Sequence, residues 1–330
     1  MTGTPTREIP ERALRSLLLS LSHQRALGRA AVRVPLTRPM VGRFVAGQRL
    51  DEALDALDRI HGAGYRTTVD VLGESVSSAE EAGVAAERYL ETLGALADRG
   101  LERNVSMKLT QMGLDIGYAT VRENVSRVLR RAEELDAFVR IDMEDHAKTD
   151  ATLAIWRELR PLHPETGVVI QSALRRSPAD IEAIIEERGR VRLCKGAYNE
   201  PASVAHPDKA DVDAAYAAMM ERLLVDGVYP AFATHDPALI RHAVRFAREK
   251  RIDRDRFEFQ MLFGVRRDLQ ERLLRADYRV RLYVPFGGEW YPYFMRRLAE
   301  RPANVLFMLR AVAREGLPRD GSGRTGSGQA

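Results

Sequence analysis

The stretch "AFVRIDME" (137–144) alternates apolar and polar side chains in the manner of a β-strand. Val139 and Ile141 point to one face, and Arg140 and Asp142 to the other, because successive side chains of a strand face opposite ways. Similar runs recur along the chain, at 65–73, 103–110, 166–173, 190–198, 229–236, 256–264 and 279–287. The sequence therefore predicts eight short strands along the chain.

Segments with helical spacing separate these strands. They lie at 76–99, 120–135, 150–160, 178–187, 208–226, 236–250, 266–276 and 289–315. Strands alternating with helices indicate parallel pairing, and eight such units fit a (β/α)8 TIM-type barrel. A doubly wound open sheet is the competing architecture, but "VLGES" after the first strand lacks its glycine-rich turn. Ser177 and Asp236, each followed by proline, are predicted helix caps.

Three regions are expected along the chain. Residues 1–62 form a predicted N-terminal helical arm, with its clearest helix in "RLDEALDALDRIHGAG" (49–64). Residues 63–318 form the barrel, and the Gly/Ser-rich tail 319–330 is predicted to be disordered. The tail matches G-x-G-x-x-G, but no strand precedes it and no helix follows, so we give this dinucleotide motif no weight.

Composition excludes several classes of protein. The 330 residues are 45% hydrophobic and 30% charged, and the formal net charge is only +4. This balance indicates a globular protein and does not imply a nucleic-acid partner. A single cysteine, Cys194, allows no internal disulfide and fits a reducing compartment. The apolar run near the N-terminus is too short for a signal peptide or a membrane span. We therefore expect a cytoplasmic protein, with peripheral contact at the inner face of the cell membrane left open.

The two faces of the predicted strands differ in polarity. The side chains in register with Val139 are nearly all apolar and should pack against the helices. The side chains in register with Asp142 are mostly polar and should point into the barrel: Asp70, Ser106, Lys108, Arg140, Gln171, Arg192, Cys194, His235, Glu258, Gln260, Arg281 and Tyr283. Barrel interiors are usually apolar. Salt bridges of Arg140, Arg192 and Arg281 with Asp70, Asp142 and Glu258 would satisfy part of this set, and a bound polar ligand would explain the rest.

The residue types narrow the chemistry. The seven histidines include no H-x-H or H-x-x-x-H pair, so no metal site is predicted. Lys195 is a possible Schiff-base nucleophile, but strand parity turns it outward. Lys108 points inward, with Asp142 its expected partner, and an ion pair would hold it protonated. Cys194 has no evident base and is expected to fill space.

The segment "WYPYFMRRLAE" (290–300) follows the last predicted strand, at the rim where barrel active sites lie. Tyr293, Arg296, Arg297 and Glu300 fall at i, i+3, i+4 and i+7, on one stripe of a helix. Glu300 can brace both guanidinium groups. The resulting fork would suit a carboxylate or a phosphate, although a solvated arginine pair remains the alternative.

Together, these motifs resemble the proline dehydrogenase family, specifically its monofunctional bacterial type. The resemblance covers nearly the whole barrel and is carried by "VSMKLT", "VRIDMED", "VRLCKGAY", "FATHD", "FEFQMLFG" and "YVPFGGEWYPYFMRRLAE" in this order. It implies an FAD-bearing (β/α)8 barrel that oxidises L-proline to Δ1-pyrroline-5-carboxylate and passes electrons to membrane quinone. A separate pyrroline-5-carboxylate dehydrogenase would then take the product.

The resemblance also implies roles for individual residues. Catalysis would involve Lys108, Asp142 and Arg192, with Arg192 near flavin N5. The substrate would meet Arg296, Arg297, Tyr283, Tyr293, Tyr198, Ala197, Leu262 and Glu300. The FAD would meet Gln171, Arg192, Lys195, Gly196, Ala197, Thr234 and His235, and Glu74 would be a rim carboxylate that meets an arginine. Cys194, in place of an aliphatic residue, and Asn199, in place of a bulky one, depart from the pattern.

Two other functions stay open. A flavin-free, aldolase-type lyase would use Lys108 or Lys195 as a Schiff base. A non-catalytic ligand-binding barrel would bind a carboxylate without turnover. A bound flavin that L-proline reduces would distinguish the dehydrogenase from both.

Overall fold

The computed structural model describes residues 41–73 and 76–300, with side chains as far as Met295. The chain divides into two compact units. One contains 35–290, and the other contains 1–34 together with 291–330. The boundaries expected at residues 62 and 318 stay predictions, and the Gly/Ser tail lies outside the described residues.

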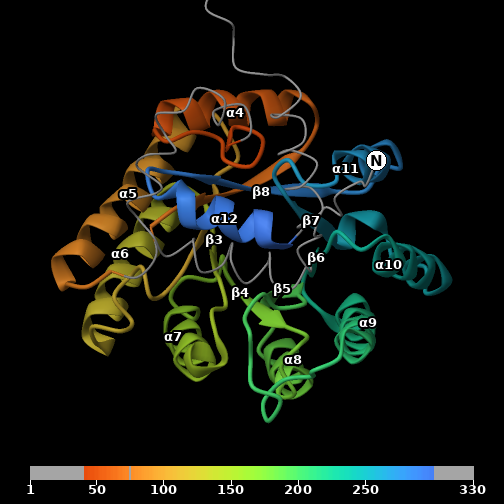
Figure 1. Ribbon diagram of the computed structural model, residues 1–330. Coiled ribbons are helices and arrows are strands. Elements are labelled where there is room, and N and C mark those ends of the chain that lie inside the picture. The colour runs from red at the N-terminus through yellow and green to blue at the C-terminus, as the bar shows by residue number, and fades with distance from the viewer. Residues whose placement is uncertain (1–40, 74–75, 301–330) are drawn as a thin grey trace, which may run out of the picture. The chain divides into compact units, whose positions relative to one another are not determined.

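Eight parallel strands close into a barrel in sequence order, β1 next to β2 and so on until β8 pairs with β1 (Figure 1). The strands are β1 (Arg66–Val71), β2 (Asn104–Met107), β3 (Phe138–Ile141), β4 (Thr166–Gln171), β5 (Arg190–Cys194), β6 (Ala231–Ala233), β7 (Glu258–Leu262) and β8 (Val280–Phe286). Each lies within a predicted strand segment, which confirms the barrel and rules out the open sheet.

Helices surround the barrel (Figure 1). They are α4 (Leu50–Gly62), α5 (Ala79–Asp98), α6 (Tyr118–Glu134), α7 (Thr149–Leu159), α8 (Ser177–Glu186), α9 (Lys209–Asp226), α10 (Pro237–Glu249) and α11 (Arg267–Arg275). Two short 3-10 turns, η1 (His146–Lys148) and η2 (Arg254–Arg256), precede α7 and β7. The helix α4 precedes β1 and packs against β1 and α5, with Leu54, Leu57 and Ile60 in the common core. It therefore belongs to the outer ring of the barrel unit.

The start of α10 shows how local sequence sets a helix boundary. Asp236 is the N-cap and accepts a hydrogen bond from Ala238 N at 2.9 Å, and Pro237 occupies the first turn. The predicted cap at Asp236 is thus confirmed. The cap predicted at Ser177 is wrong, because Arg176 is the N-cap of α8. Ser177 lies inside the helix, and its hydroxyl donates to Gln171 O at 2.6 Å instead.

The outward face of the strands packs against the helices as predicted. Val69, Val105, Val139, Ile141, Val168, Val191, Phe259 and Leu282 are all buried in the hydrophobic core. Phe257 and Phe259 meet edge-on, with ring centroids 5.6 Å apart, and Tyr278 meets Phe259 at 5.6 Å. This apolar shell fixes the strands, and thereby the opposite set of side chains that faces the barrel axis.

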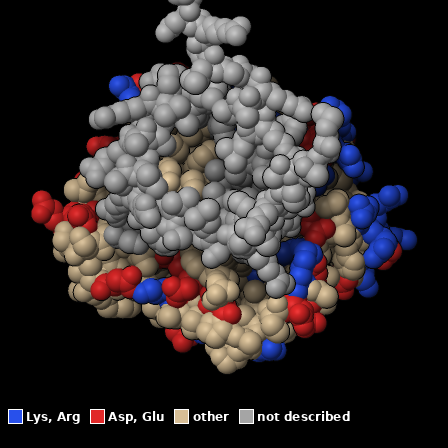
Figure 2. All heavy atoms as spheres, viewed as in Figure 1, with Lys and Arg blue, Asp and Glu red and all other residues tan. Residues whose placement is uncertain are grey.

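The described surface carries charges of both signs. Figure 2 shows acidic and basic side chains interspersed, with a group of basic ones at the right. Among residues 41–73 and 76–300, no helix is long and apolar enough to cross a membrane.

Candidate functional site

Most of the predicted site residues of the barrel lie where strands end. Lys108, Asp142, Lys195 and Thr234 each follow the last residue of a strand, and Gln171 and Leu262 are themselves last residues. All strands are parallel, so these positions share the C-terminal end of the barrel, where barrel enzymes place their active sites.

Arg192 is the centre of a buried polar cluster on the barrel axis. Its Nη1 donates to Asp142 Oδ1 at 2.5 Å, its Nη2 donates to Ser106 Oγ at 2.9 Å, and its Nε donates to Gln260 Oε1. The hydroxyl of Tyr283 donates to the other Asp142 oxygen at 2.8 Å, and the Arg192 guanidinium lies 5.2 Å from the Tyr283 ring centroid. Strands β2, β3, β5, β7 and β8 thus converge on one guanidinium. Burial raises the pKa of Tyr283 well above its usual 10.0, so its phenol remains a proton donor.

Lys108 pairs with a different carboxylate from the one expected. Its Nζ lies 3.2 Å from Asp70 Oδ1 and 3.4 Å from Oδ2. The expected partner, Asp142, binds Arg192 and Tyr283 instead. Strand β2 has β1 and β3 as neighbours, so Lys108 has a carboxylate available on either side. It takes Asp70 of β1 because Arg192 occupies the carboxylate beside β3.

The predicted salt-bridge network is confirmed in part. Arg281 donates to Glu258 Oε1 at 2.7 Å and Oε2 at 3.0 Å, and Arg192 pairs with Asp142. The carboxylate partner expected for Arg140 is wrong. Its Nη1 donates to Val168 O at 3.2 Å and Arg190 O at 2.8 Å, and its guanidinium lies 4.8 Å from the Phe138 ring centroid. Arg192 pairs with Asp142 and Arg281 pairs with Glu258, so neither carboxylate is left for Arg140. Burial lowers the pKa of Arg140.

Lys195 faces outward, as strand parity predicts. Its Nζ lies 2.5 Å from Asp213 Oδ1 of α9 and 3.0 Å from Asp236 Oδ2 at the start of α10. Both lysines considered for Schiff-base chemistry therefore carry carboxylate partners. Burial raises the pKa of the Cys194 thiol to about 12, so it remains protonated and fits the space-filling role.

The loop after β5 carries Gly196, Ala197 and Tyr198, and Tyr198 is 45% exposed. Its anchor is Glu200, whose side chain is only 5% exposed and accepts a hydrogen bond from His146 N at 2.9 Å. His146 Nδ1 contacts the same carboxylate. This contact joins the loops after β3 and β5, a connection that nothing in the sequence pattern indicated.

Thr234, His235 and Leu262 connect the ends of β6 and β7. The Thr234 hydroxyl accepts a hydrogen bond from Asp236 N at 3.1 Å, and Thr234 N donates to Gln260 O at 3.2 Å. Leu262 N donates to His235 Nε2 at 2.9 Å. The His235 ring nitrogen that accepts this bond must be unprotonated.

Gln171 and Gly196 provide a test of whether the described residues fit a flavin. The Gln171 amide donates to Met143 O at 3.2 Å and Glu144 O at 2.7 Å, which turns Oε1 away from both. That buried oxygen has no hydrogen-bond partner among the described residues. Gly196, with φ of +111°, lies beside it, and a Cβ there would come 2.9 Å from Oε1. The Gln171 Oε1 is thus a buried acceptor that lies next to a glycine, which has no side chain. This arrangement fits a planar ring that carries an N–H group, and a flavin has such a ring.

The predicted arginine fork lies on α12 (Trp290–Glu300), which confirms a helix over these positions. Residues from Tyr291 onward belong to the other compact unit. Tyr293, Arg296, Arg297 and Glu300 share one stripe of this helix by their spacing. The side chains of the last three, like residue Glu74, lie outside the described residues, so their roles stay predictions.

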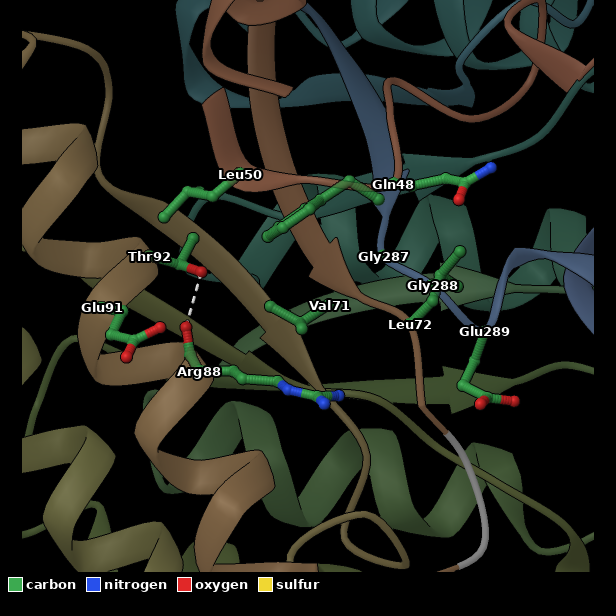
Figure 3. A pocket seen from close by; sticks show the side chains of 11 residues that line it. Gln48, Leu50, Val71, Leu72, Arg88, Glu91, Thr92, Gly287, Gly288 and Glu289 are labelled. Atoms are coloured by element: carbon green, nitrogen blue, oxygen red, sulfur yellow. Dashed lines mark hydrogen bonds between the residues drawn. The ribbon is translucent and has the colours of Figure 1, made fainter. Parts of the chain in front are cut away.

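A separate cavity of about 280 Å³ lies beside the ends of β1 and β8 (Figure 3). It is lined by Gln48, Leu50, Val71, Leu72, Arg88, Glu91, Thr92, Phe286, Gly287, Gly288 and Glu289. None of these is a predicted site residue, and Val71 belongs to the outward face of β1, so this cavity does not coincide with the axial cluster. In the described part of the chain, no group of three or more histidine, cysteine, aspartate or glutamate side chains is placed to hold a metal ion.

Comparison with known proteins identifies the family. A family profile described as "Proline dehydrogenase" matches residues 53–310. The chain belongs to the proline dehydrogenase family. It is 38% identical over 302 residues to "Proline dehydrogenase 1" of Bacillus subtilis subsp. natto, covering 92% of this chain and 100% of that protein. It is 39% identical over 279 residues to "Proline dehydrogenase" of Deinococcus radiodurans, covering 82% and 89%.

A solved structure is similar to this chain in fold. Proline utilization A from Bdellovibrio bacteriovorus, inactivated by N-propargylglycine, matches with a TM-score of 0.75 and 27% identity. The match covers 87% of this chain but only 36% of that larger protein.

Two members of the axial cluster, Ser106 and Gln260, were placed inward by strand parity but given no role from the sequence. Neutral side chains carry no charge pattern, and their contacts with Arg192 depend on which strands face each other across the barrel.

Proposed function

We propose that this member of the family oxidises L-proline to Δ1-pyrroline-5-carboxylate with FAD, and that the electrons pass to membrane quinone. The observation that carries the proposal is the buried Arg192 guanidinium, held by Asp142, Ser106 and Gln260 at the active-site end of a barrel of this family. A fixed cation in a buried site stabilises negative charge that develops beside it.

The reaction separates a hydride from a proton. The C–H bond next to the ring nitrogen breaks, its hydrogen leaves with both electrons, and the nitrogen lone pair forms the C=N bond. The nitrogen must reach the reaction as a neutral amine, so the ammonium of free proline first releases one proton to solvent. Hydride loss then leaves an iminium, which releases its N–H proton to give the neutral imine. A bound flavin would supply the acceptor for the hydride and its two electrons.

The site residues of this chain would have different roles in the reaction. Gln171, Lys195, Gly196, Ala197, Thr234 and His235 would hold the cofactor. Arg192 would lie beside its reacting edge, where negative charge grows. Lys108, paired with Asp70, and Asp142, fixed by Tyr283, would set the polar geometry of the substrate pocket. Leu262, Ala197 and Tyr198 would contact the pyrrolidine methylenes, and water would be excluded there.

The substrate carboxylate would be held by Arg296 and Arg297, with Glu300 bracing them and Tyr293 beside them. A bidentate fork of this kind fixes orientation as well as affinity, and hydride transfer needs a fixed donor–acceptor geometry. Arg296→Met and Arg297→Met should each raise the KM for proline while flavin stays bound. Normal KM values in both variants would contradict the fork.

The deciding experiment is anaerobic mixing of the flavin-loaded protein with L-proline. The oxidised flavin absorbance should disappear, pyrroline should form in an amount equal to the flavin, and a soluble quinone should restore the absorbance. D-proline serves as the matched control for geometry. A flavin that stays oxidised in excess L-proline would contradict the proposal. Borohydride trapping of a carbonyl substrate on Lys108 or Lys195 would instead support the lyase.

A further inference from the structure

Gln260 connects the Arg192 cluster to a second buried ion pair. Its side-chain oxygen accepts the hydrogen bond from Arg192 Nε, and its Nε2 donates to Glu258 Oε1 at 2.5 Å. Gln260 is 3% exposed, and Arg192, Glu258 and Arg281 are 5% exposed or less. The amide therefore bridges two charged groups in a region closed to bulk water.

The two neighbours leave the amide only one orientation. Arginine can only donate hydrogen bonds, and an ionised carboxylate can only accept them. The amide oxygen must therefore face Arg192, and the amide nitrogen must face Glu258. A flipped amide would place two donors together and an oxygen against a carboxylate, so Arg192 Nε would lose its acceptor and Glu258 would lose the amide donor.

Glu258 stays ionised because of Arg281. Burial alone would raise the pKa of Glu258, but the adjacent Arg281 guanidinium outweighs this effect and holds the pKa at about 2. Arg281 is itself fixed by Thr67 O at 2.6 Å and by Glu102 Oε2 at 3.0 Å. A continuous chain of charged and polar groups thus runs along the barrel axis from Glu102 through Arg281, Glu258 and Gln260 to Arg192.

We propose that Gln260 is a positioning residue that fixes the plane of the Arg192 guanidinium, with Glu258 fixing Gln260 in turn. The inference rests on the proposed function, in which Arg192 stabilises charge beside the reacting group. Asp142 and Ser106 bind the two terminal nitrogens of Arg192, and Gln260 binds the remaining Nε. Without that third contact, the guanidinium is held only at its two terminal nitrogens, and its plane can turn about the Cδ–Nε bond and lose alignment.

A double-mutant cycle tests whether Gln260 acts through Arg192. The variants are Gln260→Met, Arg192→Met and the two combined, each loaded with flavin. Gln260→Met should lower kcat by roughly 10- to 100-fold, the usual cost of losing a supporting contact, with KM changed far less. In the Arg192→Met background, Gln260→Met should lower kcat by less than about 3-fold, because the guanidinium that Gln260 positions is absent. Equal losses in both backgrounds would overturn the proposal.

A readout that does not depend on turnover separates positioning from general damage. The midpoint potential of the bound flavin should become more negative in Gln260→Met, because a misaligned cation stabilises the reduced form less. Asn124→Leu is the matched control, since Asn124 is buried on α6 and donates to Met112 O at 3.1 Å, away from the axis. It should leave potential and kcat unchanged. A shift of potential in the control equal to that in Gln260→Met would overturn the proposal.

Glu258→Gln gives an independent test if Gln260→Met does not fold. Residue 258 does not hydrogen-bond Arg192, and a neutral amide there holds the Gln260 Nε2 less strongly than a carboxylate does. The potential should shift in the same direction as expected for Gln260→Met, and an unchanged potential would overturn the proposal. Flavin reduction by L-proline in the unsubstituted protein is measured first, so that failure of the proposed function and failure of this inference are told apart.

Discussion

The two faces of the barrel strands are stabilised in different ways. Phe257, just before β7, and Phe259 on β7 face outward into a cluster of aromatic rings, whereas Glu258 and Gln260 on β7 face inward to charged and polar partners. The outer contacts are non-directional and scale with buried area. The inner contacts depend on the angle and the charge of each group.

This difference predicts that substitutions in the outer shell and in the axial cluster affect stability and turnover differently. Dispersion and hydrophobic contacts in the shell tolerate small shifts of position, and their loss lowers stability without altering the direction of any polar group. The axial groups are each held by a limited set of partners, so the loss of one changes where another points. Stability should respond to changes in both regions, and turnover should respond mainly to changes in the axial one.

Asp142→Ala should give the largest effect, because it leaves the buried Arg192 and the Tyr283 hydroxyl without their shared partner. Breaking a buried ion pair from one side lowers the free energy of unfolding by about 3–5 kcal/mol. Misaligned electrostatic stabilisation should lower kcat/KM by roughly 10²- to 10³-fold. Chemical denaturation and steady-state kinetics measure the two losses. A variant that loses stability but keeps full turnover would remove the distinction between the regions.

Phe259→Ala should produce the opposite pattern. Removing a buried aromatic ring from the shell should lower the free energy of unfolding by about 3–5 kcal/mol. The kcat of the folded fraction should stay within about 2-fold, because Phe259 contacts no axial group through a polar atom. Phe259→Leu, which retains most of the buried area, is the matched control. Its free energy of unfolding should lie between those of Phe259→Ala and the unsubstituted protein. A large fall of kcat in the folded protein would contradict the separation.

The Glu258 carboxyl should give the axial region a pH dependence of stability. Its pKa is lowered from 4.5 to about 2, so its contribution is complete above pH 4.5 and is lost as pH falls toward 2. The shift corresponds to roughly 3 kcal/mol. Denaturation at several pH values should therefore show the difference between the unsubstituted protein and Glu258→Gln shrinking through this window. A difference that does not vary with pH would mean that Glu258 is not the titrating group.

Thr152→Val should give the smallest effect. The Thr152 hydroxyl is buried in α7 and has no hydrogen-bond partner among the described residues. Replacing an unsatisfied buried hydroxyl by a methyl group of the same shape should be neutral or raise the free energy of unfolding by up to about 1 kcal/mol. Thermal unfolding measures the change, and kcat should not move. A clear loss of stability would show that the hydroxyl has a partner.

Strand periodicity predicts the barrel because it records local geometry. The alternation in "FVRI" follows from the pleat alone, and each predicted strand segment contains an observed strand. The boundary signal at Asp236 is equally local and is correct. At Ser177, a contact with Gln171 O from the preceding strand decides where the hydroxyl points, and the helix begins one residue earlier than a serine cap requires.

Partner choice inside the barrel could not be predicted in the same way. The inward direction of Lys108, Arg140 and Asp142 follows from parity, but their partners depend on neighbours across the barrel. Adjacency of strands predicts that Asp142 pairs with Lys108, whereas Arg192 reaches Asp142 from β5. Arginine has a longer side chain with several donors, so it spans distances that adjacency rules do not consider. The fork residues Arg296, Arg297 and Glu300 of α12 are predicted from spacing, and their side chains lie outside the described residues.

The most direct test of the central claim is the rate of anaerobic flavin reduction by saturating L-proline in Arg192→Met. The account predicts a fall of roughly 10²- to 10³-fold relative to the unsubstituted protein, while flavin remains bound. Reduction at the unsubstituted rate, with flavin bound and the protein folded, would contradict the assignment of Arg192 to the reacting edge.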